Sequence, residues 1–261
     1  MSIRNKLKER EEARDKAAQG AGGGINAGLP EGVTRYVKAS EMADGKTFVM
    51  LADPDAWYFY YTHEDGAKYP SRDRYYQKHS CLHSPRKVGE DFDKYTKPNG
   101  AACISCKAKA KRKLYFMIPL FDPQYGTWRV FDSKEFHANN LIGDYDKLEK
   151  AAKKFRPDYS VVGDAVIIGK TSDGKSYSLQ SGDATPEVIQ AAATFIGSAE
   201  IDYAELANFR DESDLREIIE KAWDEAKLDK SVLGARSSGT TPDSSEPTGA
   251  PTEISDEDLP F

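Results

Sequence analysis

The chain has 261 residues, a net charge of −6 and 39% hydrophobic residues. This length fits one or two domains with one sizeable core. No stretch approaches the roughly 18 consecutive apolar residues of a membrane span, and Met1 to Gly20 lacks the apolar segment of a signal peptide. We therefore expect a cytoplasmic protein with no membrane partner.

The negative charge arises from the C-terminal end. From Ser237 to Phe261 there are six acidic residues and no Lys or Arg, so this segment accounts for the whole net charge of −6. The rest of the chain is neutral on balance. Its positive charge is concentrated in two runs rich in basic residues, at 68–87 and 107–113.

The predicted organisation has three parts. The first part, residues 1–29, consists of a charged arm at 1–19 and a Gly-rich segment after it. This segment lacks the Lys-Ser/Thr ending of a phosphate-binding loop, so we interpret it as a linker. Residues 30–230 form the core. Residues 231–261 are rich in Ser, Gly, Thr, Pro and acid, a composition that predicts a disordered tail.

The core begins with strands and continues with helices. β-branched and aromatic residues bounded by Gly, Pro and Asp predict strands at 34–38, 47–51, 57–62, 114–121 and 127–131, which favour a barrel or a sandwich. Recurring apolar residues predict an amphipathic helix from about Lys134 that stops before Pro157, with Phe136, Leu141, Tyr145, Leu148, Ala152 and Phe155 on one face. Strands at 161–168 and 175–179 follow, and then helices at about 186–195 and 213–227.

All three cysteines and three of the four histidines fall between residues 63 and 106. Cys103 and Cys106 have the two-residue spacing of a zinc knuckle, and Cys81 lies upstream of them. We favour a Cys₃His site for one structural Zn²⁺, because four protein ligands leave no open position for hydrolytic chemistry. Spacing alone favours His83 as the fourth ligand, and a redox-active or incidental cysteine pair is the alternative.

Aromatic and basic residues occur together, as binding of single-stranded nucleic acid requires. The candidate contacts are Arg72, Arg74, Tyr75, Tyr76, Lys109, Lys111, Arg112, Lys113, Tyr115, Phe116 and Trp128. Side chains alternate between faces along residues 57–61, and the more apolar set is expected to face inward. This leaves Tyr115, Tyr58 and Tyr60 as candidates for base stacking, with ordinary core packing as the alternative.

The chain ends in three acids and an apolar plug: Asp256, Glu257, Asp258, Leu259, Pro260 and Phe261. A terminal Phe with its carboxylate fits a basic-rimmed apolar pocket on a partner protein. A merely solubilising acidic tail is the alternative.

These features resemble those of known single-stranded DNA-binding proteins. The terminal tip resembles that of bacterial and phage members. The order of His63, Cys81, the 103–106 pair, the basic run 111–113 and the pair Tyr115-Phe116 resembles the zinc-containing helix-destabilising proteins of T-even phages over residues 30–168.

The resemblance implies a mainly β fold with added helices (α+β), an OB-fold-like barrel with an embedded zinc subdomain at about 63–110. It implies that His63 is the fourth zinc ligand and that the basic run and Tyr115 face the DNA. It also implies that residues 1–19 mediate self-association along the strand.

We therefore expect a non-catalytic protein that binds single-stranded DNA in phage replication, recombination and repair, in the host cytoplasm. Its tail would bind replication and recombination proteins. The alternative is a zinc-ribbon accessory factor for transcription or replication that binds duplex DNA or a polymerase. The common hydrolase and dinucleotide-binding motifs are absent from the sequence, which disfavours an enzyme.

Overall fold

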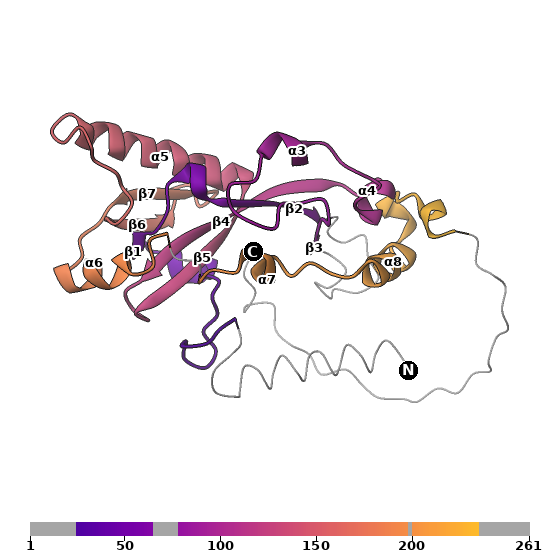
Figure 1. Cartoon of the computed structure of the whole chain (residues 1–261), viewed down its shortest axis with the longest axis horizontal. Helices are drawn as coiled ribbons and strands as arrows, with labels where there is room; N and C mark the ends of the chain where they lie inside the picture. Colours follow the sequence, from indigo (N-terminus) through magenta and orange to yellow (C-terminus); the bar gives the residue numbers. More distant parts are fainter. Residues whose placement is uncertain (1–24, 65–77, 198–199, 235–261) are drawn as a thin grey trace.

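The computed structural model describes residues 25–64, 78–197 and 200–234. These residues form an antiparallel sheet with helices on both faces (Figure 1). The strands are β1 (Lys46–Met50), β2 (Tyr58–Glu64), β3 (Lys78–Ser80), β4 (Arg112–Asp122), β5 (Thr127–Lys134), β6 (Ala165–Lys170) and β7 (Tyr177–Ser181). The helices are α3 (Phe92–Thr96), α4 (Ile104–Lys107), α5 (Glu135–Lys153), α6 (Pro186–Ala193), α7 (Tyr203–Ala207) and α8 (Glu212–Lys221). Short 3-10 helices lie at Ala39–Met42, Pro54–Ala56, Asp224–Ala226 and Lys230–Leu233.

The sheet is organised around β4, the longest strand. Its order is β3-β2-β4-β1-β6-β7, and β5 pairs with the other edge of β4. Along the edge of β4 opposite β5, the strand pairs with β2 as far as Met117 and then with β1 at Leu120 and Phe121. Since β3 and β7 each pair with a single strand among the described residues, the sheet is open. The expected OB-fold-like barrel is therefore not confirmed, because the sheet formed by the described residues does not close.

The expected α+β class is confirmed. The strands predicted at 47–51, 57–62, 114–121, 127–131, 161–168 and 175–179 correspond to β1, β2, β4, β5, β6 and β7. The segment predicted at 34–38 makes only an isolated bridge, between Tyr36 and Val130. The short elements β3, α3, α4 and α7 were not predicted, because each has too few residues to show a period.

The two faces of the sheet carry different cores. Phe48, Ile118 and Leu120 pack beneath α5 on one face, and the same face continues towards β3 with Phe59 and Tyr61 beneath α3 and α8. The other face carries a tyrosine cluster, Tyr58, Tyr60 and Tyr115, together with residues of α6 and α7. The alternation of side chains along β2 separates these two sets.

Helix α5 packs through Ala138, Leu141 and Tyr145, which are all buried. The prediction that Phe136 and Phe155 belong to the same face is wrong, since 61% of Phe136 and 87% of Phe155 are exposed. At about 100° per residue, Phe136 lies roughly 160° from Ala138 around the helix. Phe155 lies beyond the last helical residue, so the helical period no longer places it.

A buried ion network joins the sheet to the residues that precede it. The Arg129 guanidinium lies 2.6 Å from Glu41 and 2.9 Å from Asp122, and Lys46 lies 2.8 Å from Asp122. Burial alone would raise the pKa of Glu41, but hydrogen bonds, above all from Arg129, lower it to about 2. The network satisfies an arginine that is almost fully buried.

Two glycines permit a close approach at the β1–β6 edge. A Cβ atom at Gly169 would lie 2.9 Å from the Cα of Gly45, which itself has a positive φ of 87°. Neither position tolerates a side chain without a backbone shift. In the described part of the chain, no helix is long and apolar enough to cross a membrane.

Candidate functional site

Four potential metal ligands meet near the β3 edge of the sheet. The donor atoms of His63, Cys81, Cys103 and Cys106 all lie within 4.8 Å of one another, and all four residues are buried. The Sγ atoms of Cys81 and Cys106 are 3.5 Å apart. The Nε2 atom of His63 lies 3.6 Å from the Sγ of Cys103 and 3.7 Å from that of Cys106.

Strand pairing brings the first two ligands together. Phe59, Tyr61 and His63 point to the same face of β2, and His63 pairs directly with His79 of β3. Cys81 lies two residues beyond His79 and therefore on that same face, with its N–H donating to the Tyr61 carbonyl at 2.8 Å. This pairing explains how ligands 18 positions apart in sequence become neighbours.

A single helical turn supplies the other two ligands. Cys103 is the N-cap of α4, and the Lys107 N–H donates to the Cys103 carbonyl at 3.1 Å. Because residues three apart lie on one side of a helix, both sulfurs face β2. The turn ends at Lys109, which adopts a positive φ of 61° before the chain enters β4.

The donor spacing fits a tetrahedral ion. Zinc bound at about 2.3 Å to sulfur and about 2.0 Å to nitrogen holds its donors about 3.6–3.8 Å apart. Three donor–donor distances, from 3.5 to 3.7 Å, agree with this spacing. The 3.5 Å between the sulfurs of Cys81 and Cys106 is far too long for a disulfide. The cluster could therefore hold one metal ion such as zinc.

The electrostatics of the cluster also favour a cation. Hydrogen bonds with Cys106 and Cys81 hold the pKa of Cys103 well below its usual value, whereas those with Cys103 and Cys106 raise the pKa of Cys81. Burial alone would lower the pKa of His63, but the sulfurs of Cys103 and Cys106 raise it to about 9. Three sulfurs this close cannot all ionise unless a positive charge compensates them.

The three histidines in this region have different surroundings. The Nδ1 atom of His63 lies 3.2 Å from the carbonyl oxygens of Ala110 and Lys111, so Nδ1–H donates to the backbone and Nε2 faces the sulfurs. The alternative ligand His83 lies outside the cluster, with its ring 5.1 Å from that of Tyr95. Burial lowers the pKa of His79 to about 3, and its Nε2 lies 2.9 Å from the Ser105 hydroxyl.

Helix α8 covers the cluster. Leu215, Ile218 and Ile219 belong to the same buried core as the three cysteines, and α4 and α8 lie together at one end of the sheet (Figure 1). The site is thus closed to solvent by apolar side chains, which suits a structural metal better than a catalytic one.

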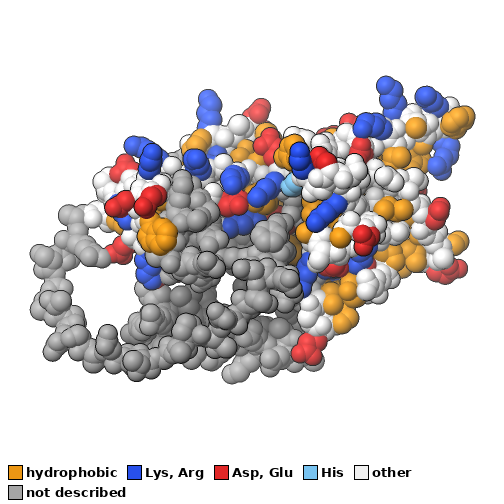
Figure 2. Space-filling view, turned by 180° about the vertical axis from the view of Figure 1, so that it is seen from behind, with side chains coloured by type: hydrophobic (Ala, Val, Ile, Leu, Met, Phe, Trp, Pro, Cys, Tyr) orange, Lys and Arg blue, Asp and Glu red, His pale blue; other side chains and the backbone are white. Residues whose placement is uncertain are grey.

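The lysines of the basic run are exposed beside this cluster. Lys107, Lys109, Lys111 and Lys113 all lie at the surface. Lys109 pairs with Asp229 at 3.5 Å and Lys113 with Glu64 at 3.4 Å. Figure 2 shows Lys and Arg side chains along the upper edge of the opposite view, with Asp and Glu side chains among them.

Arg112 differs from these lysines because its guanidinium is held by the protein. It donates to the carbonyl oxygens of His83, Tyr95 and Thr96 at 2.8–3.1 Å and lies 3.8 Å from the centre of the Tyr61 ring. Its cationic plane therefore ties α3 to β4, so substitution of Arg112 would affect stability as well as any ligand.

The aromatic residues expected to stack on bases lie mostly in the core. Tyr58, Tyr60 and Tyr115 are buried, and Tyr203 of α7 stacks on Tyr58 with a centroid distance of 5.0 Å. Phe116 is half-buried, and Trp128 is buried with the Arg35 guanidinium 3.9 Å from its ring centre. None of the three tyrosines presents a free ring face in this arrangement.

Several predicted site residues lie outside the described residues. These are the first basic and aromatic cluster, Arg72, Arg74, Tyr75 and Tyr76, and the terminal tip, Asp256, Glu257, Asp258, Leu259, Pro260 and Phe261. Their roles stay predictions.

A groove that the sequence did not predict opens next to the start of β4. It has a volume of about 510 Å³ and is lined by residues of β2, α3, β4, β5 and α5: Tyr61, Phe92, Thr96, Arg112, Lys113, Leu114, Lys134, Glu135 and Phe136. Two of its rings are exposed, Phe92 at 41% and Phe136 at 61%. Such rings were missed because their exposure depends on how α3 and α5 dock, which no local pattern records.

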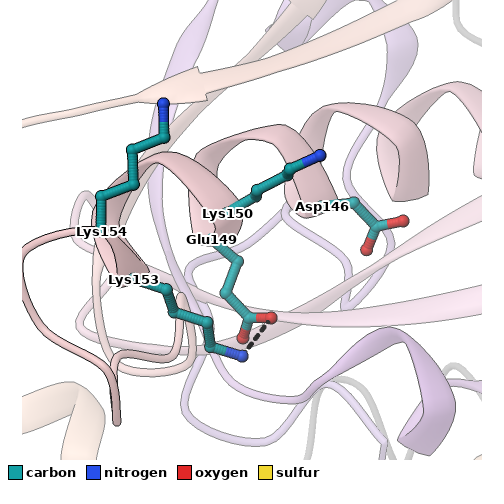
Figure 3. Close-up of a pocket in the computed structure, with 5 residues that line it drawn as sticks. All are labelled: Asp146, Glu149, Lys150, Lys153 and Lys154. Atoms are coloured by element: carbon teal, nitrogen blue, oxygen red, sulfur yellow. Dashed lines mark hydrogen bonds and ion pairs between the residues drawn. The ribbon is translucent and has the colours of Figure 1, made fainter.

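A second hollow, of about 540 Å³, lies along α5 (Figure 3). Its lining is Asp146, Glu149, Lys150, Lys153 and Lys154, with Lys153 paired to Glu149 at 2.8 Å. Charged side chains of one helix surface line it without an aromatic ring or a buried polar group, so it has no feature of a binding site.

The fold and the cluster define a class of protein: an α+β chain built on an antiparallel sheet, with a buried His/Cys₃ group that could hold one metal ion. Comparison with protein families, curated proteins and solved structures found no match to this chain. Its function must therefore be inferred from the residues themselves.

Proposed function

We propose that this protein binds single-stranded DNA without sequence preference, and that one structural Zn²⁺ is held by His63, Cys81, Cys103 and Cys106. The proposed setting is phage DNA replication, recombination and repair. The order of ligands, basic run and aromatic pair along the sequence supports this proposal, as does the neutral charge of the chain outside its acidic C-terminal segment.

The observation that carries the proposal is the position of the lysine run. Lys107 and Lys109 lie at the end of the metal-ligating turn, Lys111 and Lys113 follow where the chain enters the central strand, and all four are exposed. No acid interrupts the run. Closely spaced cations on a rigid element are what a protein needs to follow the phosphates of a strand.

The metal would contribute structure rather than reactivity. When bound, zinc supplies a fixed tetrahedral link between β2, the segment after β3 and α4. The chain's own residues then orient the lysines: His63 hydrogen-bonds to the backbone at Ala110 and Lys111, at the point where the basic run enters β4. Loss of the link would loosen the lysines from the sheet.

The two terminal segments of the sequence have proposed roles in protein–protein contacts. The acidic tip at 256–261 would bind replication and recombination proteins, and residues 1–19 would mediate self-association along DNA. Deletion of residues 256–261 should abolish partner binding without weakening the binding of an isolated oligonucleotide, as measured by pull-down and anisotropy on the same preparation.

The central test is the binding of a fluorescent oligo-dT and of a matched duplex at two salt concentrations, with zinc content measured on the same sample. We expect a preference for the single strand and an affinity that falls with salt. The double variant Lys107→Ala/Lys111→Ala should bind more weakly and lower the salt slope by about 1.4, since each phosphate contact to a single strand contributes about 0.7.

Lys150→Ala is the matched control, because Lys150 is an exposed lysine on α5, away from the run. It should leave the affinity and the slope near their wild-type values. The proposal would be refuted if folded, metal-loaded protein did not bind oligo-dT at low ionic strength. A preference for duplex would instead support an accessory factor of transcription or replication.

A further inference from the structure

Two exposed phenylalanines distinguish the groove from the rest of the described surface. Phe92 is the first residue of α3 and Phe136 lies in the first turn of α5, and both helices cover the same face of the sheet (Figure 1). Phenylalanine is among the residues most often fully buried in folded proteins. Two in one groove are therefore a candidate surface for an apolar, planar ligand.

The groove is also cationic and rigid at its base. Arg112, stacked on Tyr61 and bonded to three carbonyls, is fixed in place. Lys113 and Lys134 line the edge of the groove, and their ammonium groups lie 3.4 and 3.5 Å from Glu64 on the side of the sheet that carries Tyr115. Two acids accompany these three cations: Glu135 in the lining, and Glu64, which pairs with both lysines.

Rings beside cations match the two parts of a nucleotide in an unpaired strand. We propose that this groove binds unstacked nucleobases on Phe136 and Phe92, with the adjoining phosphates held by Lys113 and Lys134. The inference rests on the proposed function and assigns the base contacts to a face opposite the buried tyrosine cluster. It also explains why burial of Tyr58, Tyr60 and Tyr115 is compatible with strand binding.

Base stacking can be separated from charge with an abasic strand. Affinity is measured for oligo-dT and for a strand of the same length and charge in which every base is missing. Wild-type protein should bind oligo-dT more tightly. Phe136→Ala should weaken oligo-dT binding by about 5- to 150-fold, the loss expected for one stacked base, and leave the abasic strand unaffected.

Phe136→Trp should bind oligo-dT about as tightly as the wild type does, because an indole ring offers at least as large a stacking surface as a phenyl ring. Phe155→Ala is the control: Phe155 is the most exposed phenylalanine in the described residues but lies at the far end of α5. Phe92→Ala should act as Phe136→Ala does. The ring centroids of Phe92 and Phe59 are 4.9 Å apart, so Phe92→Ala also removes a contact with the core. The melting temperature of this variant is therefore measured on the same preparation.

The outcomes separate this inference from the proposed function. If wild-type protein binds neither strand, the proposed function fails. If it binds both strands equally, or if Phe136→Ala binds oligo-dT as wild type does, strand binding stands and the assignment of this groove is overturned. Equal weakening on both strands would likewise contradict base stacking.

Discussion

The metal cluster makes the sharpest prediction, which concerns the loss of one ligand. Cys106→Ser replaces a sulfur lying 3.5 Å from Cys81 and 3.7 Å from the His63 Nε2. Structural zinc sites contribute about 10–16 kcal/mol of binding free energy, so one of four ligands accounts for about 2.5–4 kcal/mol. Removal of Cys106 should thus weaken zinc binding by about two to three orders of magnitude.

The same loss should appear as thermal destabilisation. Each kcal/mol of lost stability lowers the melting temperature of a folded domain of this size by about 2–4 °C, so the melting temperature should fall by about 5–16 °C. The assays are metal analysis of the purified protein, competition with a chromophoric chelator, and thermal unfolding with and without added zinc.

Two histidine variants test the identity of the fourth ligand. His63→Gln should lose affinity as Cys106→Ser does, whereas His83→Gln should retain one equivalent of metal, because the His83 ring packs on Tyr95 outside the cluster. Cys106→Ser with wild-type zinc affinity would refute the cluster as a metal centre. Metal lost from His83→Gln and kept by His63→Gln would refute the choice of ligand.

Three further predictions concern the scaffold. Because the pKa of Glu41 is lowered to about 2, its stabilising effect is complete above about pH 4.5 and is lost as the pH falls through 2. Glu41→Gln should therefore remove about 2 kcal/mol of the loss of unfolding free energy on acidification, as measured by denaturant titration at several pH values. An unchanged pH dependence of the unfolding free energy would contradict the ion network. Arg112→Lys should cost about 1–3 kcal/mol in chemical unfolding, because an ammonium cannot bond three carbonyls in the plane of a guanidinium; wild-type stability would contradict the tie between α3 and β4. Gly169→Ala should cost about 1–3 kcal/mol through its clash with Gly45, whereas Gly143→Ala, with no atom within 4 Å of the new Cβ, should be neutral or stabilising in the same assay.

The sequence predicted the elements that have a clear period or a strong local composition. The strands β1, β2, β4, β5, β6 and β7 follow from apolar runs bounded by turn residues, and the stripe through Leu141 and Tyr145 places α5 correctly on the sheet. Helix α8 was predicted to extend to 227 but ends at Lys221, where Ala222 leaves the helical conformation. Residues 224–226 form a separate 3-10 turn, which composition alone cannot distinguish from a continued helix.

The site could be predicted only in part, for reasons of distance along the chain. The 103–106 pair is a local feature, but the choice between His63 and His83 depends on the pairing of β2 with β3, which spacing does not encode. Tyr58 is buried because Tyr203 stacks on it from a helix about 145 residues later, beyond the reach of any window on the sequence.

Helix α8 covers the candidate metal centre, and this cover would determine how fast a bound ion exchanges as well as how tightly it is held. With all four donors buried, an ion can leave only when this end of the protein opens, and such openings cost up to the global free energy of unfolding. A chelator in excess would then strip metal at a rate set by the protein's own opening and independent of chelator concentration. In a cell whose free zinc drops suddenly, copies already loaded would keep their ion while newly made chains would go without.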